Sequence, residues 1–188
     1  IAAMHRGKFL DNLISVISTC GIAVPSFVIC TVLMYFLGVH LKILPTYGLT
    51  SWKHYVMPVM ALSFYPMAYI MRLMRSSMLD VLGQDYMRTC KAKGVSQAVS
   101  IFKHALRNAI LPVITYVGPM LAYTLTGSFV VEKIFTIPGL GGEFIGSISS
   151  RDYTVIMGTT IFLATLLIVM NVIVDIIYKI VDPRIKLN

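Results

Sequence analysis

The chain alternates between long apolar segments and shorter polar ones. Four apolar segments, at about 12–39, 55–73, 109–131 and 153–180, are each long enough to cross roughly 30 Å of hydrocarbon as a helix. The second segment is the shortest. Prolines lie within the second and third segments, where they predict kinks rather than ligand sites; they are Pro58, Pro66, Pro112 and Pro119. The pattern predicts an all-α membrane protein, a polytopic bundle with four transmembrane helices.

Composition supports a bilayer environment. Of the 188 residues, 57% are hydrophobic and 13% are charged, whereas a soluble domain carries roughly 25% charge. The net charge of +8 is that of basic loops beside a membrane and does not indicate nucleic acid. No signal peptide is recognisable. The first residue, Ile1, stands in a polar turn, so we expect a fragment whose earlier membrane helices are missing. Three scattered cysteines predict free thiols.

The loops set the expected orientation. Twelve of the sixteen Lys and Arg residues fall on one side of the four segments, and the positive-inside rule places that side in the cytoplasm. Both ends of the chain are then cytoplasmic, while 41–54 and 132–152 face outward. The inner set is Arg6, Lys8, Arg72, Arg75, Arg88, Lys91, Lys93, Lys103, Arg107, Lys179, Arg184 and Lys186, and the outer set is Lys42, Lys53, Lys133 and Arg151.

The inner loop between the second and third segments, 77–108, divides at Gly94. We expect 77–93 to continue as a helix out of the membrane and Ser96 to cap a second helix. That second helix carries an apolar stripe. Such a helix either lies on lipid headgroups or docks into a groove on a cytoplasmic partner, and amphipathicity alone leaves both readings open. The stripe is Val95, Val99, Phe102, Leu106 and Ala109.

The run Asp85-Tyr86-Met87-Arg88-Thr89-Cys90-Lys91-Ala92-Lys93-Gly94 resembles the loop that permeases of ABC importers present to their ATPase subunits. Against the general signature of that family, E-A-A, three residues, Gly, nine residues, I-x-L-P, the Glu and the Pro are absent. The run, with His104-Ala105-Leu106-Arg107 after it, is instead similar to the peptide-permease branch, with Cys90 in place of the usual Ala.

The resemblance extends along the chain in several short motifs in order. It implies that 1–188 is the C-terminal part of a type I ABC importer transmembrane domain, with 77–108 as its cytoplasmic coupling loop. The motifs are Arg6-Gly7-Lys8 with Asp11, Pro25-Ser26-Phe27, Leu44-Pro45, Val131-Glu132-Lys133-Ile134-Phe135, Ile137-Pro138-Gly139-Leu140-Gly141, Arg151-Asp152-Tyr153 and Asp182-Pro183-Arg184.

Residue roles follow from the same resemblance. The implied ATPase-coupling residues are Asp85, Tyr86, Arg88, Thr89, Cys90, Lys91, Ala92, Lys93, Gly94, Val95, Ser96, Val99, Phe102 and His104. The implied outer loop or gate residues are Glu132, Phe135, Pro138, Gly139, Leu140 and Gly141; from composition alone Pro138–Gly142 is a turn, and Glu132 an interfacial charge.

The implied function is import of oligopeptides or dipeptides across a bacterial inner membrane by alternating access, with nickel chelates or glutathione as alternative cargoes. The implied partners are two ABC ATPase subunits, a second permease subunit, an extracytoplasmic peptide-binding protein and the lipid bilayer, but no nucleic acid. ATP would be bound by the partners, since the chain has no Walker A pattern.

Two other classes compete with the importer. An ion channel or facilitator needs charged rings or carbonyl filters, and an intramembrane enzyme needs converging polar residues at the helix centres. The segments show neither pattern, and no metal-ligand cluster or nucleophile motif is present. We therefore expect a non-enzymatic subunit with no cofactor or metal of its own.

Overall fold

The computed structural model describes residues 2–181, and every regular element in that range is a helix. The predicted motif at Asp182-Pro183-Arg184, and the basic residue Lys186, lie outside this range. The elements are η1 Ala2–His5, α1 Phe9–Ala23, α2 Ser26–Leu33, η2 Met34–His40, α3 Lys53–Leu82, α4 Asp85–Ala92, α5 Gln97–Val99, η3 Ser100–Ala105, α6 Leu106–Ala109, α7 Leu111–Thr126, α8 Phe129–Phe135, α9 Leu140–Ser150 and α10 Tyr153–Val181.

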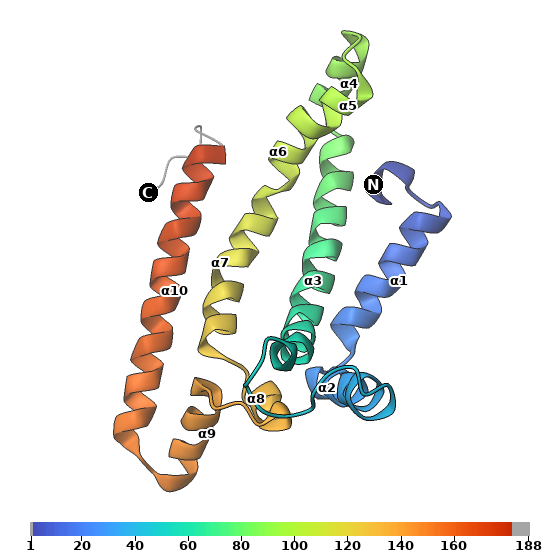
Figure 1. Ribbon diagram of the computed structural model, residues 1–188. Helices are drawn as coiled ribbons and strands as arrows, with labels where there is room; N and C mark the ends of the chain where they lie inside the picture. The colour runs from blue at the N-terminus through green and yellow to red at the C-terminus, as the bar shows by residue number, and fades with distance from the viewer. Residues whose placement is uncertain (1, 182–188) are drawn as a thin grey trace.

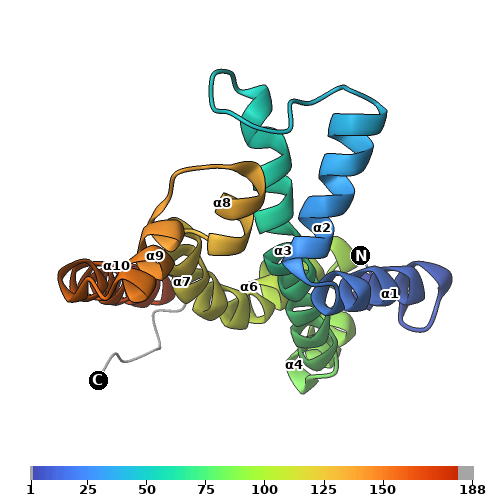
Figure 2. The same cartoon turned by 90° about the horizontal axis from the view of Figure 1, so that it is seen from below.

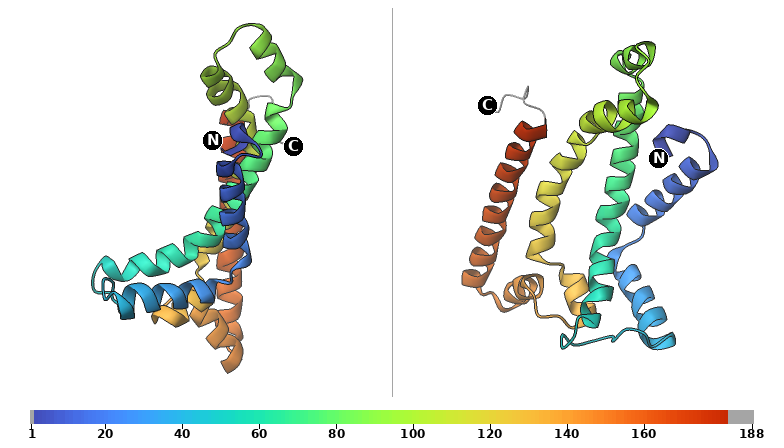
Figure 3. Two further views of the ribbon diagram at one scale, coloured as in Figure 1. Left: turned by 90° about the vertical axis from the view of Figure 1, so that its right-hand side faces the viewer. Right: turned by 45° about the horizontal axis from the view of Figure 1, so that its top comes forward.

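Four long helices lie side by side in one layer, in the order α1, α3, α7, α10 (Figure 1). Seen from its edge, the layer is thin (Figure 3). One end of the layer carries η1 and α4, and the opposite end carries α2, α8 and α9. The predicted inner and outer segments therefore lie at opposite ends of the layer.

Small residues bring neighbouring helices of the layer close together. A Cβ on Gly21 of α1 would lie 2.6 Å from the Cβ of Ala68 on α3. A Cβ on Gly118 of α7 would overlap Val174 of α10. Ala122, one turn further along α7, is fully buried. In lipid, burial of apolar surface contributes little to helix association, so close contacts of this kind stabilise the packing of the helices. The prediction of a packed bundle is confirmed.

The first predicted membrane segment is not one helix. α1 ends at Ala23, and α2 begins at Ser26 at an angle of 101° to it. The cause is Pro25, which lacks an N–H and holds the preceding Val24 in an extended conformation (φ −79°, ψ 122°). A single helix over 12–39 was therefore a wrong prediction.

α2 and η2 form an arm together with the first turns of α3 (Figures 2 and 3). The arm packs on α8 through a buried apolar cluster; its members are Cys30, Met57, Ala61, Val131 and Phe135. The rest of α3 runs within the layer (Figure 3), so the helix turns in its proline-containing half. The segment predicted to be shortest is in fact a helix of 30 residues, the longest described.

Two helices are individually long and apolar enough to cross a membrane, Lys53–Leu82 and Tyr153–Ile180. Two further spans are possible if each broken pair counts as one, with a bend of 101° at Pro25 and of 47° between α6 and α7. Two predicted segments thus recur within continuous helices, and the first is bent at Pro25. The third, predicted over 109–131, ends with α7 at Thr126, and residues 129–131 belong to the separate helix α8.

Candidate functional site

The predicted coupling residues gather at one end of the molecule, on α4, α5 and η3 (Figure 1). We call residues 85–104 the coupling tip. None of the fourteen predicted residues is buried: Cys90, Val95 and His104 are half-buried, and the others are exposed. The tip is therefore a free surface of this chain.

Gly94 makes the sharp turn at the centre of the tip. It has φ +73°, in the left-handed region that glycine adopts without a Cβ clash. The N–H of Gly94 donates to the carbonyl of Lys91, and the N–H of Val95 donates to that of Cys90, at 3.1 Å each. This pair of bonds is the Schellman motif, which satisfies the last carbonyls of α4. The predicted division of the loop into two helices at Gly94 is confirmed.

Other details of the tip differ from the prediction. The helix expected over 77–93 breaks at Gly83–Gln84, so α3 ends at Leu82 and α4 is a separate helix. Ser96 stands at the predicted N-cap position, but its hydroxyl makes no capping hydrogen bond.

The face of the second helix that packs on the chain coincides with the predicted stripe only in part: Ala109 is buried, and Val95 and Leu106 are half-buried. Ile101, Ala105 and Ala109 are buried, whereas Val99 and Phe102 point outward, with Phe102 72% exposed. A stretch of π-helix at Ser100–Ala105 widens the turn, which shifts the face that meets α3. Val99 and Phe102 are therefore left largely exposed.

α4 is attached to the rest of the chain at few points. No residue of α4 is buried. Met87 packs at the edge of the cluster around Ile101 and Ala105, and the side-chain amide of Asn108 donates to the hydroxyl of Tyr86 at 2.9 Å. The Asp85–Arg88 pair, at 3.5 Å, is fully solvated and adds little. α4 is therefore held to the rest of the chain mainly through Tyr86 and Met87. Asn108 was missed from the sequence.

At the opposite end, Glu132 of α8 organises the predicted gate. Its Oε2 accepts the N–H of Gly142 at 2.6 Å, so the carboxylate caps α9 in the way that an N-cap side chain would. The negative charge also suits the positive end of the helix dipole. Three glycines surround this carboxylate where a Cβ would collide with it or press on it, and they are Gly127, Gly139 and Gly141. We call Glu132 with these glycines the glycine cradle.

The cradle changes the interpretation of the outer segment. Glu132 is half-buried and bonded, not a loose interfacial charge. Pro138 and Gly139 form the expected turn, but Leu140 begins a helix of 11 residues that the sequence analysis missed. Phe135, predicted at the gate, is buried in the cluster beneath the arm. Pro138, Gly139 and Leu140 line a pocket together with Glu132.

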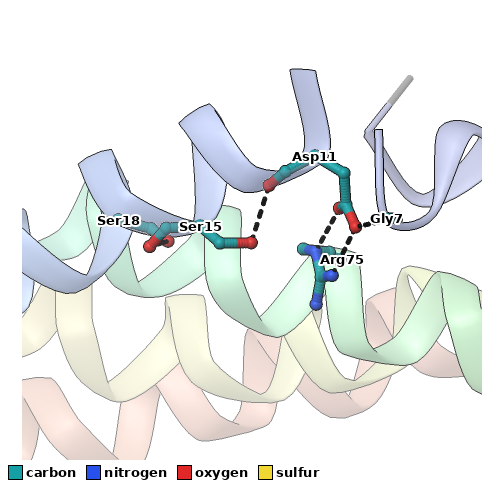
Figure 4. A network of polar contacts seen from close by, with 5 residues as sticks. All are labelled: Gly7, Asp11, Ser15, Ser18 and Arg75. Carbon is teal, nitrogen blue, oxygen red and sulfur yellow. Dashed lines mark hydrogen bonds and ion pairs between the residues drawn. The ribbon is translucent and has the colours of Figure 1, made fainter. Parts of the chain in front are cut away.

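A second polar contact joins α1 to α3 and was also missed. Asp11 is 1% exposed and receives two bonds from Arg75, 2.6 Å from Nε to Oδ1 and 2.8 Å from Nη2 to Oδ2 (Figure 4). The N–H of Gly7 donates to the same carboxylate at 2.9 Å. Such two-pronged pairs fix geometry as well as charge. Arg75, which the sequence placed among the inner loop charges, is therefore a helix-to-helix clamp.

Within residues 2–181 no group of three His, Cys, Asp or Glu side chains could hold a metal ion. The three cysteines are free thiols. The polar groups that the structure does bring together are arranged to hold helices in place.

Comparison with known proteins identifies relatives over the whole chain. The family described as "Binding-protein-dependent transport system inner membrane component" matches residues 1–187. The chain is 53% identical over 188 residues to the "Dipeptide transport system permease protein DppB" of Bacillus subtilis (strain 168), and 45% identical over 186 residues to the protein of that name in Lactococcus lactis subsp. cremoris (strain MG1363).

The "Glutathione transport system permease protein GsiC" of Escherichia coli (strain K12) is 41% identical over 186 residues. These matches cover 99–100% of this chain but 61% of each relative. The chain thus spans about three fifths of the length of the curated relatives it matches.

Proposed function

The chain belongs to the family of binding-protein-dependent transport system inner membrane components, and from that premise we propose that it is part of the permease subunit of an ATP-driven importer of short peptides. Two separate ATPase subunits would drive it, and a second permease subunit would complete the pathway. An external binding protein would deliver the peptide, and the cargo would cross by alternating access.

The coupling tip is the observation that carries this proposal. Its residues resemble an ATPase-docking loop, and they lie together at one end of the layer on a helix with no buried residue. Phe102 and Val99 offer apolar surface there, and burying such surface stabilises a complex by about 25 cal/mol per Å². A motion imposed on the lightly held α4 would reach α6 and α7 through the Tyr86–Asn108 bond and the cluster around Ile101.

The distribution of charge supports the orientation. Among residues 2–181, ten Lys and Arg residues belong to the predicted inner set, including Arg88, Lys91, Lys93 and Lys103 of the tip, whereas four belong to the predicted outer set. We propose that the tip and η1 face the cytoplasm and that α8 and α9 face outward, toward the binding protein.

Short peptides are proposed as cargo because both kinds of relative are named for such molecules, dipeptides and glutathione. The higher identity is to the dipeptide proteins, so dipeptides come first and glutathione, itself a modified tripeptide, is the second candidate. ATPase activity of the reconstituted importer, measured with a dipeptide, a pentapeptide or glutathione on the binding protein, separates these cargoes.

Substitutions at Gly94 test the coupling role in the full-length protein within its complex. Within residues 2–181, a Cβ at Gly94 would meet no atom within 4 Å apart from its chain neighbours. Asn and Asp also tolerate the left-handed conformation better than other residues with a Cβ. Gly94→Asp and Gly94→Asn should therefore leave α4 folded and the protein inserted, yet abolish peptide uptake because the new side chain meets the ATPase.

Gly83→Ala is the matched control. Gly83 lies at the same end of the molecule, has φ −79°, and a Cβ there would make only ordinary contacts at 3.5 Å or more. It should retain uptake. Uptake that survives Gly94→Asp, or purification of the protein without any ATP-binding subunit, would contradict the proposal and favour a channel or facilitator.

A further inference from the structure

The two broad sides of the helix layer differ in chemistry. On one side, Met67, Met71, Met74 and Met78 follow one another at helical spacing along α3 and, with residues of α1 and η3, line an apolar groove of about 650 Å³. We call these four residues the methionine face. A second groove, between α7 and α10, is lined by Val113, Ile114, Val117 and Leu121 and is also apolar.

The other side of α3 carries tyrosines. Tyr65 and Tyr69 lie about 160° around the helix from the methionine face, by the 100° turn per residue of an α-helix. Their rings stack with centroids 6.2 Å apart, and the Tyr69 ring lies 4.4 Å from that of Tyr116 on α7. We call Tyr65, Tyr69 and Tyr116 the tyrosine face. Arg72 and Ser76 continue it at the same spacing toward α4.

Tyr65 and Tyr69 lie in the middle turns of α3, and Tyr116 lies in the second turn of α7, which continues α6 across a 47° bend. Tyr69 lies about 20 Å along α3 from its C-terminal end, and Tyr116 about 15 Å from the end of α7, at 1.5 Å per residue. Tyrosine in membrane proteins normally lies at the headgroup level, where its hydroxyl meets water. Within residues 2–181, none of the three hydroxyls has a hydrogen-bond partner.

An unpaired hydroxyl in hydrocarbon costs free energy, so this side of the layer needs polar surroundings. Prolines in the same two helices leave carbonyls without their helical donor. Pro66 cannot donate to the carbonyl of Leu62, and Pro119 cannot donate to that of Thr115, since proline has no N–H. Tyrosine hydroxyls and freed carbonyls together can donate to and accept from a peptide main chain, while the rings suit varied side chains.

We propose that the tyrosine face lines the translocation path and contacts the main chain of the transported peptide, while the methionine face packs against lipid or apolar helices. This inference rests on the proposed function and adds to it which side of the helix layer faces the translocation path.

Cysteine accessibility tests the assignment in the full-length transporter. Cys20, Cys30 and Cys90 are first replaced by Ser, and single cysteines are then placed at Tyr69 or Tyr116. A water-soluble, membrane-impermeant thiol reagent should label both, and a transported dipeptide on the binding protein should slow labelling. Matched controls on the methionine face, Met67→Cys and Met71→Cys, should stay unlabelled.

A second measurement removes only the hydroxyls. Tyr69→Phe with Tyr116→Phe keeps both rings, and the loss of one or two hydrogen bonds to the peptide should reduce the uptake rate, at saturating binding protein, by roughly threefold to tenfold. Tyr35→Phe, on the exposed arm, is the control and should transport normally.

The outcomes distinguish the assignment of the translocation path from the proposal that the protein is an ATP-driven importer. Equal labelling of both faces, labelling of the methionine face alone, or unchanged uptake in the double Phe variant would overturn the path assignment, even with ATPase coupling intact. Labelling of the tyrosine face without any ATPase partner would uphold an aqueous path while the importer proposal failed.

Discussion

The glycine cradle makes a sharp prediction at Gly139. This residue has φ −156° and ψ 167°, an extended conformation that alanine adopts without strain. Any effect of Gly139→Ala must therefore come from the new methyl group. That Cβ would lie 2.5 Å from Oε1 and 2.8 Å from Oε2 of Glu132.

The size of the effect follows from these distances. An ordinary contact is about 3.5 Å, so the carboxylate must withdraw by roughly 0.7–1 Å. Its 2.6 Å bond to the N–H of Gly142 would then stretch to about 3.3–3.6 Å, where little of a hydrogen bond remains. Losing a charge-assisted bond costs about 1.5 kcal/mol for a half-exposed carboxylate. We expect the melting temperature to fall by roughly 3–6 °C.

The assay is thermal unfolding of the purified full-length complex in detergent. Gly146→Ala is the matched control, because Gly146 lies in the same helix, α9, and a Cβ there meets nothing within 4 Å. It should leave stability unchanged or raise it by up to about 1 kcal/mol, since alanine favours helix more than glycine does.

A double-mutant cycle with Glu132→Ala isolates the contact. Once the carboxylate is gone, the methyl group of Gly139→Ala has nothing to displace, and the substitution should have little further effect. If Gly139→Ala is as stable as the unmodified protein, or if it costs the same in the Glu132→Ala background, the cradle does not hold α9.

Three further predictions concern the packing of the layer. Gly21→Ala should destabilise the complex by about 1–3 kcal/mol through overpacking against α3, and Ala68→Gly should restore it in the same melting assay. Gly118→Ala should destabilise the complex in the same way, through overpacking against Val174 of α10, and Val174→Ala should restore the melting temperature. An unchanged melting temperature in Gly118→Ala would contradict this prediction. Asp11→Asn keeps the size of the side chain but removes the charge that the guanidinium of Arg75 contacts. It should increase the rate of proteolysis in the turn between η1 and α1. Equal cleavage rates in the two proteins would show that the ion pair does not hold α1.

Local features of the sequence were enough to predict much of this protein. Apolar segments of about 20 residues indicated where helices cross, because the bilayer sets that length. Gly94 marked the turn of the coupling tip, because only its left-handed conformation closes the end of α4 in this way. The stretch from Asp85 to Gly94 indicated the family through its residues alone.

Other features depended on contacts between distant residues. The 101° break at Pro25 was not predicted, since its angle follows from the packing of α2 on α3 and α8. Asp11 and Arg75 are 64 positions apart, and neither has a neighbour in sequence that reveals the pair. The sequence indicated only an interfacial charge at Glu132, because its hydrogen bond to the N–H of Gly142 on α9 depends on the folded chain.

The division has a physical reason. Helix formation, helix ends and membrane spans follow from residues within a few turns of one another, so a single sequence displays them. The choice of the face that each helix buries, the partner that each charge finds and the bend at a proline depend on neighbours that only the folded chain supplies. For this protein the sequence therefore determined the apolar segments, the turn at Gly94 and the family, and the tertiary structure alone determined where the first helix breaks, the clamp, the cradle and the tyrosine face.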